Sequence, residues 1–177
     1  MLEGHFQLSS GRHSGLYVEK FRLLERPPET DALCRMIADW ARGLSPDIVC
    51  GPTTGGLLVS YEVARHLGLL SIFAESDEGG GRSFGRGFTI TPGQRVLVVD
   101  DVLTTGGSIR DVLAAVRSLG GEPVAVAVLI DRSGGNVDFS NGPVGGVPLF
   151  ACLHLDLPAY AAGACPLCEQ GLPLTIT

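Results

Sequence analysis

The sequence predicts an α/β fold in which a parallel, twisted sheet is flanked by helices. Short apolar segments alternate with longer segments of helical spacing, an order that builds a parallel sheet covered on both faces. Residues 96–99 are four consecutive apolar residues, as expected for a strand buried on both of its faces. The chain has 177 residues, of which 45% are hydrophobic and 18% charged, so we expect a single domain over residues 1–177.

The first half of the chain predicts a small lobe followed by the start of the α/β core. Residues 1–24 have no clear period and are broken by turn residues, so we expect an appended lobe. After Pro27 and Pro28, apolar residues recur at helical spacing and predict a helix over 30–44. The next elements are a strand at 47–51 and a helix at 55–67, which Gly68 closes.

The second half continues the alternation. Its predicted elements are a strand at 69–75, a polar glycine-rich loop at 76–87, an extended segment at 88–91, the central strand from 96, a helix at 109–119, a strand at 123–131, a Gly- and Pro-rich loop at 134–148 and a last strand at 149–155. Residues 28–155 are therefore expected to form the core.

The residues after the central strand predict a binding site for a sugar phosphate. Asp100 and Asp101 stand at the carboxyl end of this strand, where open α/β sheets bind ligands. Small hydroxyl and glycine residues then begin the next helix, where free N–H groups and the helix dipole favour an anion: Thr104, Thr105, Gly106, Gly107 and Ser108. Two carboxylates beside such a cradle suit ribose hydroxyls, bound directly or around Mg²⁺. Helix capping alone would need one aspartate, not two.

A second loop of this kind precedes the helix at 55–67. Thr53, Thr54 and Gly55 lie between a short strand and the helix, so backbone N–H groups again face an anion. Two anion-binding loops suit a ribose that carries a diphosphate. The alternative is an ordinary turn after a strand.

The composition excludes several classes of protein. The net charge of −6 argues against a general nucleic-acid surface. We expect a cytoplasmic protein, because no apolar run approaches the length of a membrane span and the first residues lack the pattern of a secretory signal. Lys20 is the only lysine against twelve arginines, so other cationic roles fall to arginine. The five cysteines are expected to be reduced.

Four segments together resemble the orotate phosphoribosyltransferases of the type I phosphoribosyltransferase family. They are residues 4–14 with Tyr17, the loop at 50–56, the motif at 96–108 and the Ile-Asp-Arg at 130–132. The resemblance implies a type I phosphoribosyltransferase fold with a small hood made of residues 1–24 and the C-terminal segment. It also implies transfer of the 5-phosphoribosyl group from phosphoribosyl diphosphate to orotate, giving orotidine 5′-monophosphate and pyrophosphate in pyrimidine synthesis, with Mg²⁺ and a homodimer.

The resemblance also assigns roles to residues. Asp100 and Asp101 would bind the ribose hydroxyls and possible Mg²⁺, residues 104–108 the 5′-phosphate, and residues 53–55 the pyrophosphate. Arg132 would pair with the orotate carboxylate, where the alternative is a surface ion pair. The remaining orotate contacts would come from Thr104, Ser9 and Ser10.

The loop at 76–87 departs from the family pattern. Members carry lysines or paired arginines and often a histidine there, whereas Arg82 and Arg86 are its only cations, beside a triple glycine and three acids, of which Glu75 directly precedes the loop. We therefore expect weaker stabilisation of the leaving pyrophosphate by this loop. We also expect a mobile lid, poorly ordered without ligand, whose two arginines reach pyrophosphate on closure.

Thr54 and Ser9 stand where many members have lysine. A transferase for another nucleobase, or a regulatory protein that binds phosphoribosyl diphosphate without turnover, remains open.

The C-terminal third holds a possible metal motif. Cys152, His154, Cys165 and Cys168 form C-x-H and C-x₂-C pairs that could supply a tetrahedral zinc site. The alternative, which we favour, is that the two cysteines near the chain end are buried as small apolar side chains.

Overall fold

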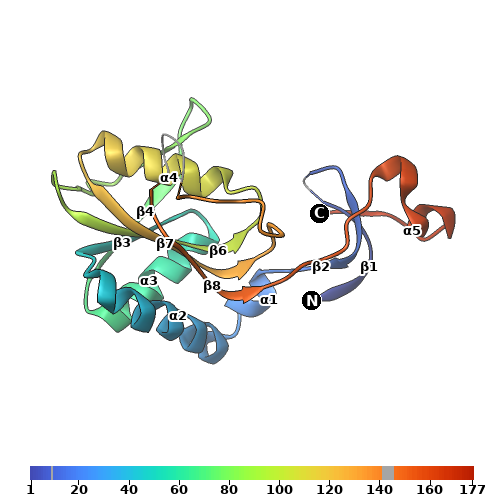
Figure 1. The fold of residues 1–177 in the computed structure, drawn as a ribbon, viewed down its shortest axis with the longest axis horizontal. Coiled ribbons are helices and arrows are strands. Elements are labelled where there is room, and N and C mark those ends of the chain that lie inside the picture. The colour runs from blue at the N-terminus through green and yellow to red at the C-terminus, as the bar shows by residue number, and fades with distance from the viewer. Residues whose placement is uncertain (9, 141–145) are drawn as a thin grey trace.

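The computed structural model describes residues 1–8, 10–140 and 146–177, and it consists of a layered core with a smaller lobe beside it (Figure 1). The core sheet has six strands in the order β5-β4-β3-β6-β7-β8, and all neighbouring pairs are parallel except β4 with β5. The predicted parallel sheet flanked by helices is confirmed. The strands are β3 (Ile48–Pro52), β4 (Leu70–Ser76), β5 (Arg82–Ser83), β6 (Arg95–Leu103), β7 (Glu122–Asp131) and β8 (Leu149–His154).

Helices cover both faces of this sheet. On one face lie α2 (Pro27–Ala41) and α3 (Gly55–Leu67), and on the other lies α4 (Gly107–Ser118) (Figure 1). The side chains of β6 alternate between the two layers, with Val96 and Val98 under α4 and Leu97 and Val99 under α2 and α3. All four are fully buried, which explains why the sequence of this strand is continuously apolar.

Several boundaries differ from the predicted ones for physical reasons. Helix α2 begins three residues early, because Pro27 and Pro28 occupy its first turn, where a missing N–H costs nothing. Its predicted last turn is a separate 3₁₀ turn, η1 (Arg42–Leu44). Strand β6 continues past residue 99 to Leu103, so both aspartates belong to the strand. The predicted loop at 76–87 contains β5.

The two ends of the chain form the smaller lobe together. Strand β1 (Leu2–Gln7) pairs antiparallel with β2 (His13–Tyr17) and parallel with β9 (Thr175–Ile176), so both termini lie in this lobe (Figure 1). We call β1, β2 and residues 156–177 the terminal lobe. It also holds η2 (Ala162–Ala164) and α5 (Pro166–Glu169), while α1 (Phe21–Leu24) connects it to the core. No described helix has the length and apolar character needed to cross a membrane.

Candidate active site

A cleft of about 840 Å³ lies between the carboxyl ends of the core strands and the terminal lobe. Its core wall comes from the ends of β3, β6 and β7, which is the edge where open α/β sheets bind ligands. Its other wall includes Ser10 and Arg12 from the β1–β2 connection and residues 157–159 after β8. Most of the sequence-predicted site residues therefore meet in one place, although they come from segments far apart in the chain.

The carboxylates of Asp100 and Asp101 lie at the centre of the core wall. Both residues are buried, at 8% and 3% exposure, and both line the cleft. Asp100 Oδ1 accepts a hydrogen bond from the backbone N–H of Asp101 at 2.9 Å. Burial, and next the charge of Asp101, raise the pKa of Asp100 to about 7. A buried acidic pair of this kind is short of positive charge, as expected of a site that receives hydroxyl donors or a cation.

Lys20 supplies one positive charge to this pair. Its Nζ lies 3.0 Å from Oδ2 and 3.4 Å from Oδ1 of Asp101. Only Oδ1 accepts an aligned hydrogen bond, so within the described residues Oδ2 is a buried acceptor without a donor. Sequence analysis did not assign Lys20 to the site, although its being the sole lysine was a visible signal.

The loop between β3 and α3 is packed directly against the acidic pair. A Cβ atom on Gly55 would overlap the carboxylate of Asp101, so only glycine allows this approach. A Cβ on Gly51 would likewise overlap the backbone at the start of α3. Thr53, Thr54 and Gly55 all line the cleft, as the two-loop interpretation predicts. The peptide bond between Thr53 and Thr54 is cis.

The loop after β6 curves around a small hollow of about 50 Å³. Residues 104–109 and Asp100 line this hollow. Gly106 caps α4 in a left-handed conformation (φ 76°), which glycine adopts without strain. The N–H groups of the first turn of α4 have no acceptor within the helix. Among the described residues, no hydrogen bond engages the hydroxyls of Thr104, Thr105 or Ser108. The loop therefore offers a set of donors to an anion.

Arg132 stands where β7 ends and faces the same cleft. Its backbone N–H donates to the carbonyl of Leu103 at 2.8 Å, which places it beside the end of β6. Its Nε is buried and has no hydrogen-bond partner among the described residues. Burial lowers the pKa of Arg132, as expected of a guanidinium that lacks a counter-charge. The alternative of a surface ion pair is wrong in this structure, since no described carboxylate pairs with Arg132.

The two arginines of the 76–87 loop lie in different places. Arg82 lines the cleft, and its Nη1 donates to Thr53 Oγ1 and to the carbonyl of Ala74, each at 3.3 Å. Arg86 does not line the cleft and instead forms an ion pair with Glu75 at 2.7 Å.

The 76–87 loop has more local structure than the sequence predicts. The Asp77 carboxylate accepts hydrogen bonds from the N–H groups of Gly79 and Gly81, which folds the acidic end into a tight turn. Strand β5 pairs with β4, and Phe84 packs against the core. Phe84 therefore anchors the loop to the core, while closure of the loop on a ligand stays a prediction.

The remaining predicted residues divide into three groups. Ser10 lines the cleft, and Ser9 lies outside the described residues. Cys152 and His154 contact the core, through the carbonyl of Leu33 and the carboxylate of Asp131 respectively. Cys165 and Cys168 lie in the terminal lobe beside two histidines. The possible zinc set of Cys152, His154, Cys165 and Cys168 is not formed, because the chain between residues 154 and 165 carries the second pair away from the first. The favoured interpretation, in which both cysteines near the chain end are buried, is correct for Cys165 and wrong for Cys168, which is exposed.

Comparison with known proteins shows the family of this chain. A family model described as a phosphoribosyl transferase domain matches residues 22–148. Curated relatives named orotate phosphoribosyltransferase include those of Heliobacterium modesticaldum, 47% identical, and Pelotomaculum thermopropionicum, 48% identical. Each alignment covers 98% of this chain, and 88% and 87% of the two relatives respectively.

Solved structures agree with these relatives. The orotate phosphoribosyltransferase of Aeropyrum pernix superposes with a TM-score of 0.69 at 29% identity, covering 87% of each chain. The adenine phosphoribosyltransferase of Thermoanaerobacter pseudethanolicus has a TM-score of 0.64 at 20% identity, covering 78% of this chain and 88% of its own, and shows the shared fold alone.

Proposed function

The chain belongs to the orotate phosphoribosyltransferases of the phosphoribosyltransferase family, and we propose that it transfers the 5-phosphoribosyl group from phosphoribosyl diphosphate to orotate in the cleft described above. The products are orotidine 5′-monophosphate and pyrophosphate. One observation supports this reaction most directly: the unpaired, buried Nε of Arg132 shares a cleft with the acidic pair and the hydroxyl-rich loop. A planar carboxylate can accept two parallel hydrogen bonds from a guanidinium.

Phosphoribosyl diphosphate fits the core wall of the cleft in one orientation. Its 5′-phosphate would occupy the loop at 104–108, where helix N–H groups and free hydroxyls converge. Its ribose hydroxyls would donate to Asp100 and Asp101, and its diphosphate would face residues 53–55 and Arg82. This orientation directs the reacting carbon of the ribose toward Arg132 and the terminal lobe.

The donor set also fits Mg²⁺. Asp100 and Asp101 present carboxylate oxygens, the ligands that Mg²⁺ prefers, and Asp101 Oδ2 has no hydrogen-bond donor among the described residues. Bound with the substrate, Mg²⁺ would offset the negative charge of the pyrophosphate. Asp100 and Asp101 are the residues that would hold the ion.

The reaction needs no nucleophilic side chain. The bond between the anomeric carbon and pyrophosphate oxygen breaks, a bond to a ring nitrogen of orotate forms, and the ribose passes through an oxocarbenium-like state. Residues of the chain contribute by position and charge: Arg132 holds the base, Asp100 and Asp101 hold the ribose, and Arg82 stabilises the departing pyrophosphate.

The terminal lobe acts as a hood over the base in this proposal. Ser10, Arg12 and residues 157–159 line the side of the cleft that faces the core strands. Arg12 donates to the carbonyl of Ala159, which fastens the two lobe segments to each other over the cleft. A hood of this kind keeps water from the reactive ribose.

A homodimer is part of the proposal. Leu58 and Tyr61 of α3 are exposed, at 44% and 65%, and line a surface hollow with Leu24 and Pro27. A second copy of the chain would cover these apolar side chains.

Pyrophosphate release with a panel of bases tests the function. We expect turnover with orotate and none with adenine, hypoxanthine or uracil. Preference for a purine would overturn the assignment of orotate. Tight binding of phosphoribosyl diphosphate without turnover of any base would favour the regulatory alternative, which has one structural argument: Arg86 is held by Glu75 outside the cleft.

A further inference from the structure

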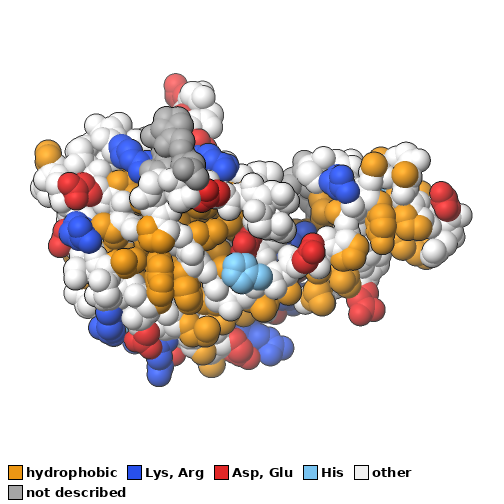
Figure 2. Space-filling model, in the orientation of Figure 1, with side chains coloured by type: hydrophobic (Ala, Val, Ile, Leu, Met, Phe, Trp, Pro, Cys, Tyr) orange, Lys and Arg blue, Asp and Glu red, His pale blue; other side chains and the backbone are white. Residues whose placement is uncertain are grey.

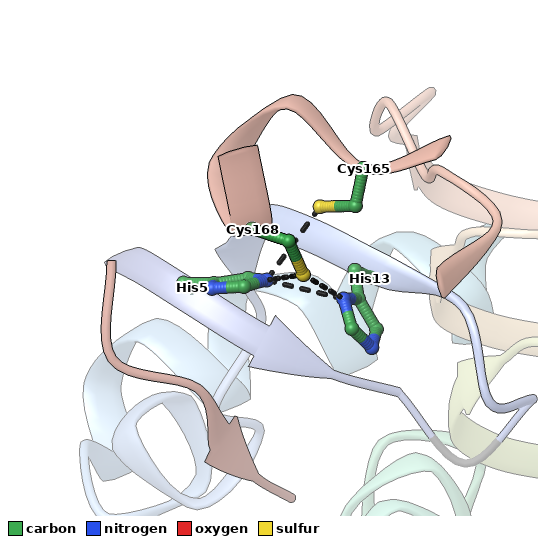
Figure 3. Close-up of side chains that lie close together, drawn as sticks. All are labelled: His5, His13, Cys165 and Cys168. Atoms are coloured by element: carbon green, nitrogen blue, oxygen red, sulfur yellow. Dashed lines mark hydrogen bonds between the residues drawn. The ribbon is translucent and has the colours of Figure 1, made fainter. Parts of the chain in front are cut away.

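Two histidines and two cysteines converge inside the terminal lobe, away from the cleft (Figure 3). His5 comes from β1, His13 from β2, and Cys165 and Cys168 from the start and end of the turn that α5 forms. Their donor atoms all lie within 4.8 Å of one another. His5 Nε2 is 3.1 Å from His13 Nδ1, 3.5 Å from Cys165 Sγ and 3.7 Å from Cys168 Sγ, and Cys168 Sγ is 3.3 Å from His13 Nδ1.

Three of these four separations match the edges of a tetrahedron around zinc, and the 3.1 Å between the two histidine nitrogens is slightly shorter than such an edge. With Zn–S near 2.3 Å and Zn–N near 2.0–2.1 Å, neighbouring donor atoms in a tetrahedral site stand about 3.3–3.8 Å apart. Four protein donors would fill such a site and leave no position for a substrate. The set would therefore be structural, not catalytic.

Hydrogen bonding alone does not satisfy this arrangement. His5 Nδ1 lies 2.9 Å from the carbonyl of Leu172 and must carry a proton to bond with it, so in the neutral ring Nε2 is a bare lone pair. This single lone pair faces three atoms at once: His13 Nδ1, Cys165 Sγ and Cys168 Sγ. A carbonyl that fixes the far nitrogen of a histidine is also the usual outer partner of a metal-binding histidine.

The terminal lobe has little apolar core of its own. Within its described residues, Phe6 and Cys165 are the only buried hydrophobic side chains. Apolar residues of the lobe lie at the surface instead (Figure 2), among them Leu2, Leu172, Leu174 and Ile176. Small units with so little apolar core are commonly held by a metal or by disulfides.

We propose that His5 Nε2, His13 Nδ1, Cys165 Sγ and Cys168 Sγ bind one Zn²⁺, which fastens the C-terminal segment to the β1–β2 hairpin. Nitrogen and thiolate donors select zinc over Mg²⁺. The ion would join residues more than 150 positions apart in sequence and would add to the pairing of β1 with β9 in this lobe. It would also brace the cleft, because the β1–β2 connection lies directly before His13, and His13 pairs with Tyr160 just after residues 157–159.

Metal analysis of the whole chain tests the proposal. The protein is produced with zinc in the medium and purified under reducing conditions, and its zinc content is measured by mass spectrometry. We expect about one zinc per chain. Cys165→Ser, Cys168→Ser and His5→Asn should each lower the content at least fivefold, and His5→Asn keeps an amide that can still donate to Leu172. The matched control is Cys152→Ser with His154→Asn, which changes the other cysteine and histidine pair and should retain the zinc.

Two measurements on the unmodified protein keep the test valid if a variant does not fold. Removal of zinc with a chelator should lower Tm, and added Zn²⁺ should restore it. Replacement by Co²⁺ should give the visible absorption of tetrahedral cobalt with thiolate charge-transfer bands.

Three outcomes would overturn the site. The first is a reduced protein that neither contains zinc nor takes up Zn²⁺. The second is zinc that persists in the ligand variants. The third is a stoichiometric disulfide between Cys165 and Cys168 in freshly isolated protein that binds no metal.

Discussion

The Nζ of Lys20 lies 3.0 Å from Oδ2 of Asp101, and this contact joins the segment after β2 to the carboxyl end of the central strand. Lys20 is the only lysine of the chain, and its ammonium is the cation that contacts the acidic pair directly among the described residues. Its charge also lowers the pKa of Asp100, against the larger effects of burial and of Asp101. The protonation of Asp100 therefore depends on a residue outside the sheet.

Replacement of Lys20 should shift the pH dependence of catalysis. In Lys20→Met the pKa of Asp100 rises further, because one of the charges that lowers it is lost. Since the ribose hydroxyls need an ionised acceptor, the acid limb of kcat/KM for phosphoribosyl diphosphate should move to higher pH. Lys20→Arg should restore most of the wild-type profile. An unchanged acid limb in Lys20→Met would show that Lys20 has no electrostatic role in the site.

Asp100→Asn should stabilise the fold while it abolishes turnover. In the folded chain Asp100 has a pKa of about 7, above its ordinary value of 3.8, so between these values the folded state binds the extra proton. Stability contributed by this group is present below pH 4 and is lost as pH rises toward 7. An asparagine keeps an oxygen for the N–H of Asp101 and removes the buried charge.

The stabilisation should therefore depend on pH. We expect Asp100→Asn to raise the free energy of unfolding by more than about 1 kcal/mol at pH 8, equivalent to about 2–4 °C in Tm, and by much less at pH 4.5. Urea unfolding at the two pH values measures this difference. A variant that is less stable than wild type at pH 8 would show that the carboxylate of Asp100 is well compensated in the free protein.

Arg132→Ala should affect orotate far more than phosphoribosyl diphosphate. Loss of a charge-assisted pair costs about 1.5–3 kcal/mol, or roughly a 10- to 150-fold rise in KM for orotate. The Nε that now lacks a partner is the group expected to bind the carboxylate. Arg132→Lys keeps the charge without the planar fork and should recover only part of the loss. Equal losses for both substrates, measured by initial rates, would remove Arg132 from the base site.

The sequence predicted local features of this molecule better than distant ones. The bounds of α3 were predicted correctly, because Gly68 takes a left-handed conformation that ends the helix after a clear apolar period. The acidic pair and its loop were found for the same reason, since all their determinants lie within a dozen residues.

The errors concern contacts between distant segments. His5 and His13 were not grouped with Cys165 and Cys168, because β1 pairs with β9 across almost the whole chain and no local period encodes this pairing. Lys20 was missed because its partner Asp101 lies 81 residues away. The partner of Arg86 was missed because the fold of the loop depends on the Asp77 turn and on the burial of Phe84.

Gly55→Ala should displace the carboxylate of Asp101 with little effect on stability. The new Cβ would overlap the end of a side chain, not the backbone, so the carboxylate can rotate away. Since that carboxylate positions the ribose, kcat/KM for phosphoribosyl diphosphate should fall by roughly two orders of magnitude. Gly43→Ala is the matched control, because a Cβ there meets nothing and should leave the kinetics unchanged. Wild-type kinetics in Gly55→Ala would mean that the position of Asp101 does not limit the reaction.

The two loop arginines should act in different subunits. Arg82 already contacts Thr53 of its own chain, so Arg82→Ala should lower kcat within its own subunit. Arg86 lies outside its own cleft, held by Glu75, so any contact it makes with pyrophosphate should be in the neighbouring subunit of a dimer. Release from Glu75 would be the closing step of the loop.

Mixed dimers separate these roles. Subunits with Arg86→Ala are mixed with subunits that carry Asp100→Asn and Asp101→Asn, after sedimentation has shown that the protein is a dimer. If Arg86 acts across the interface, a mixed dimer contains one intact site, and random exchange should restore about a quarter of wild-type activity. A second comparison joins both changes in one chain, Arg86→Ala with Asp100→Asn, and mixes this chain with wild type. Both sites of a mixed dimer are inactive when Arg86 acts across the interface, whereas one site survives when Arg86 acts within its own subunit.

Subunits with Arg82→Ala, mixed with the subunits that carry Asp100→Asn and Asp101→Asn, are the control for the first mixture. No recovery of activity is expected from them. When Arg82 serves its own subunit, one site of the mixed dimer lacks the arginine and the other lacks the two carboxylates, so neither is intact. Recovery with Arg86→Ala but not with Arg82→Ala would place the two arginines in different subunits' sites. Failure of the Arg86→Ala mixture to recover, with subunit exchange confirmed by mass spectrometry, would mean that Arg86 serves its own subunit or has no role in the reaction.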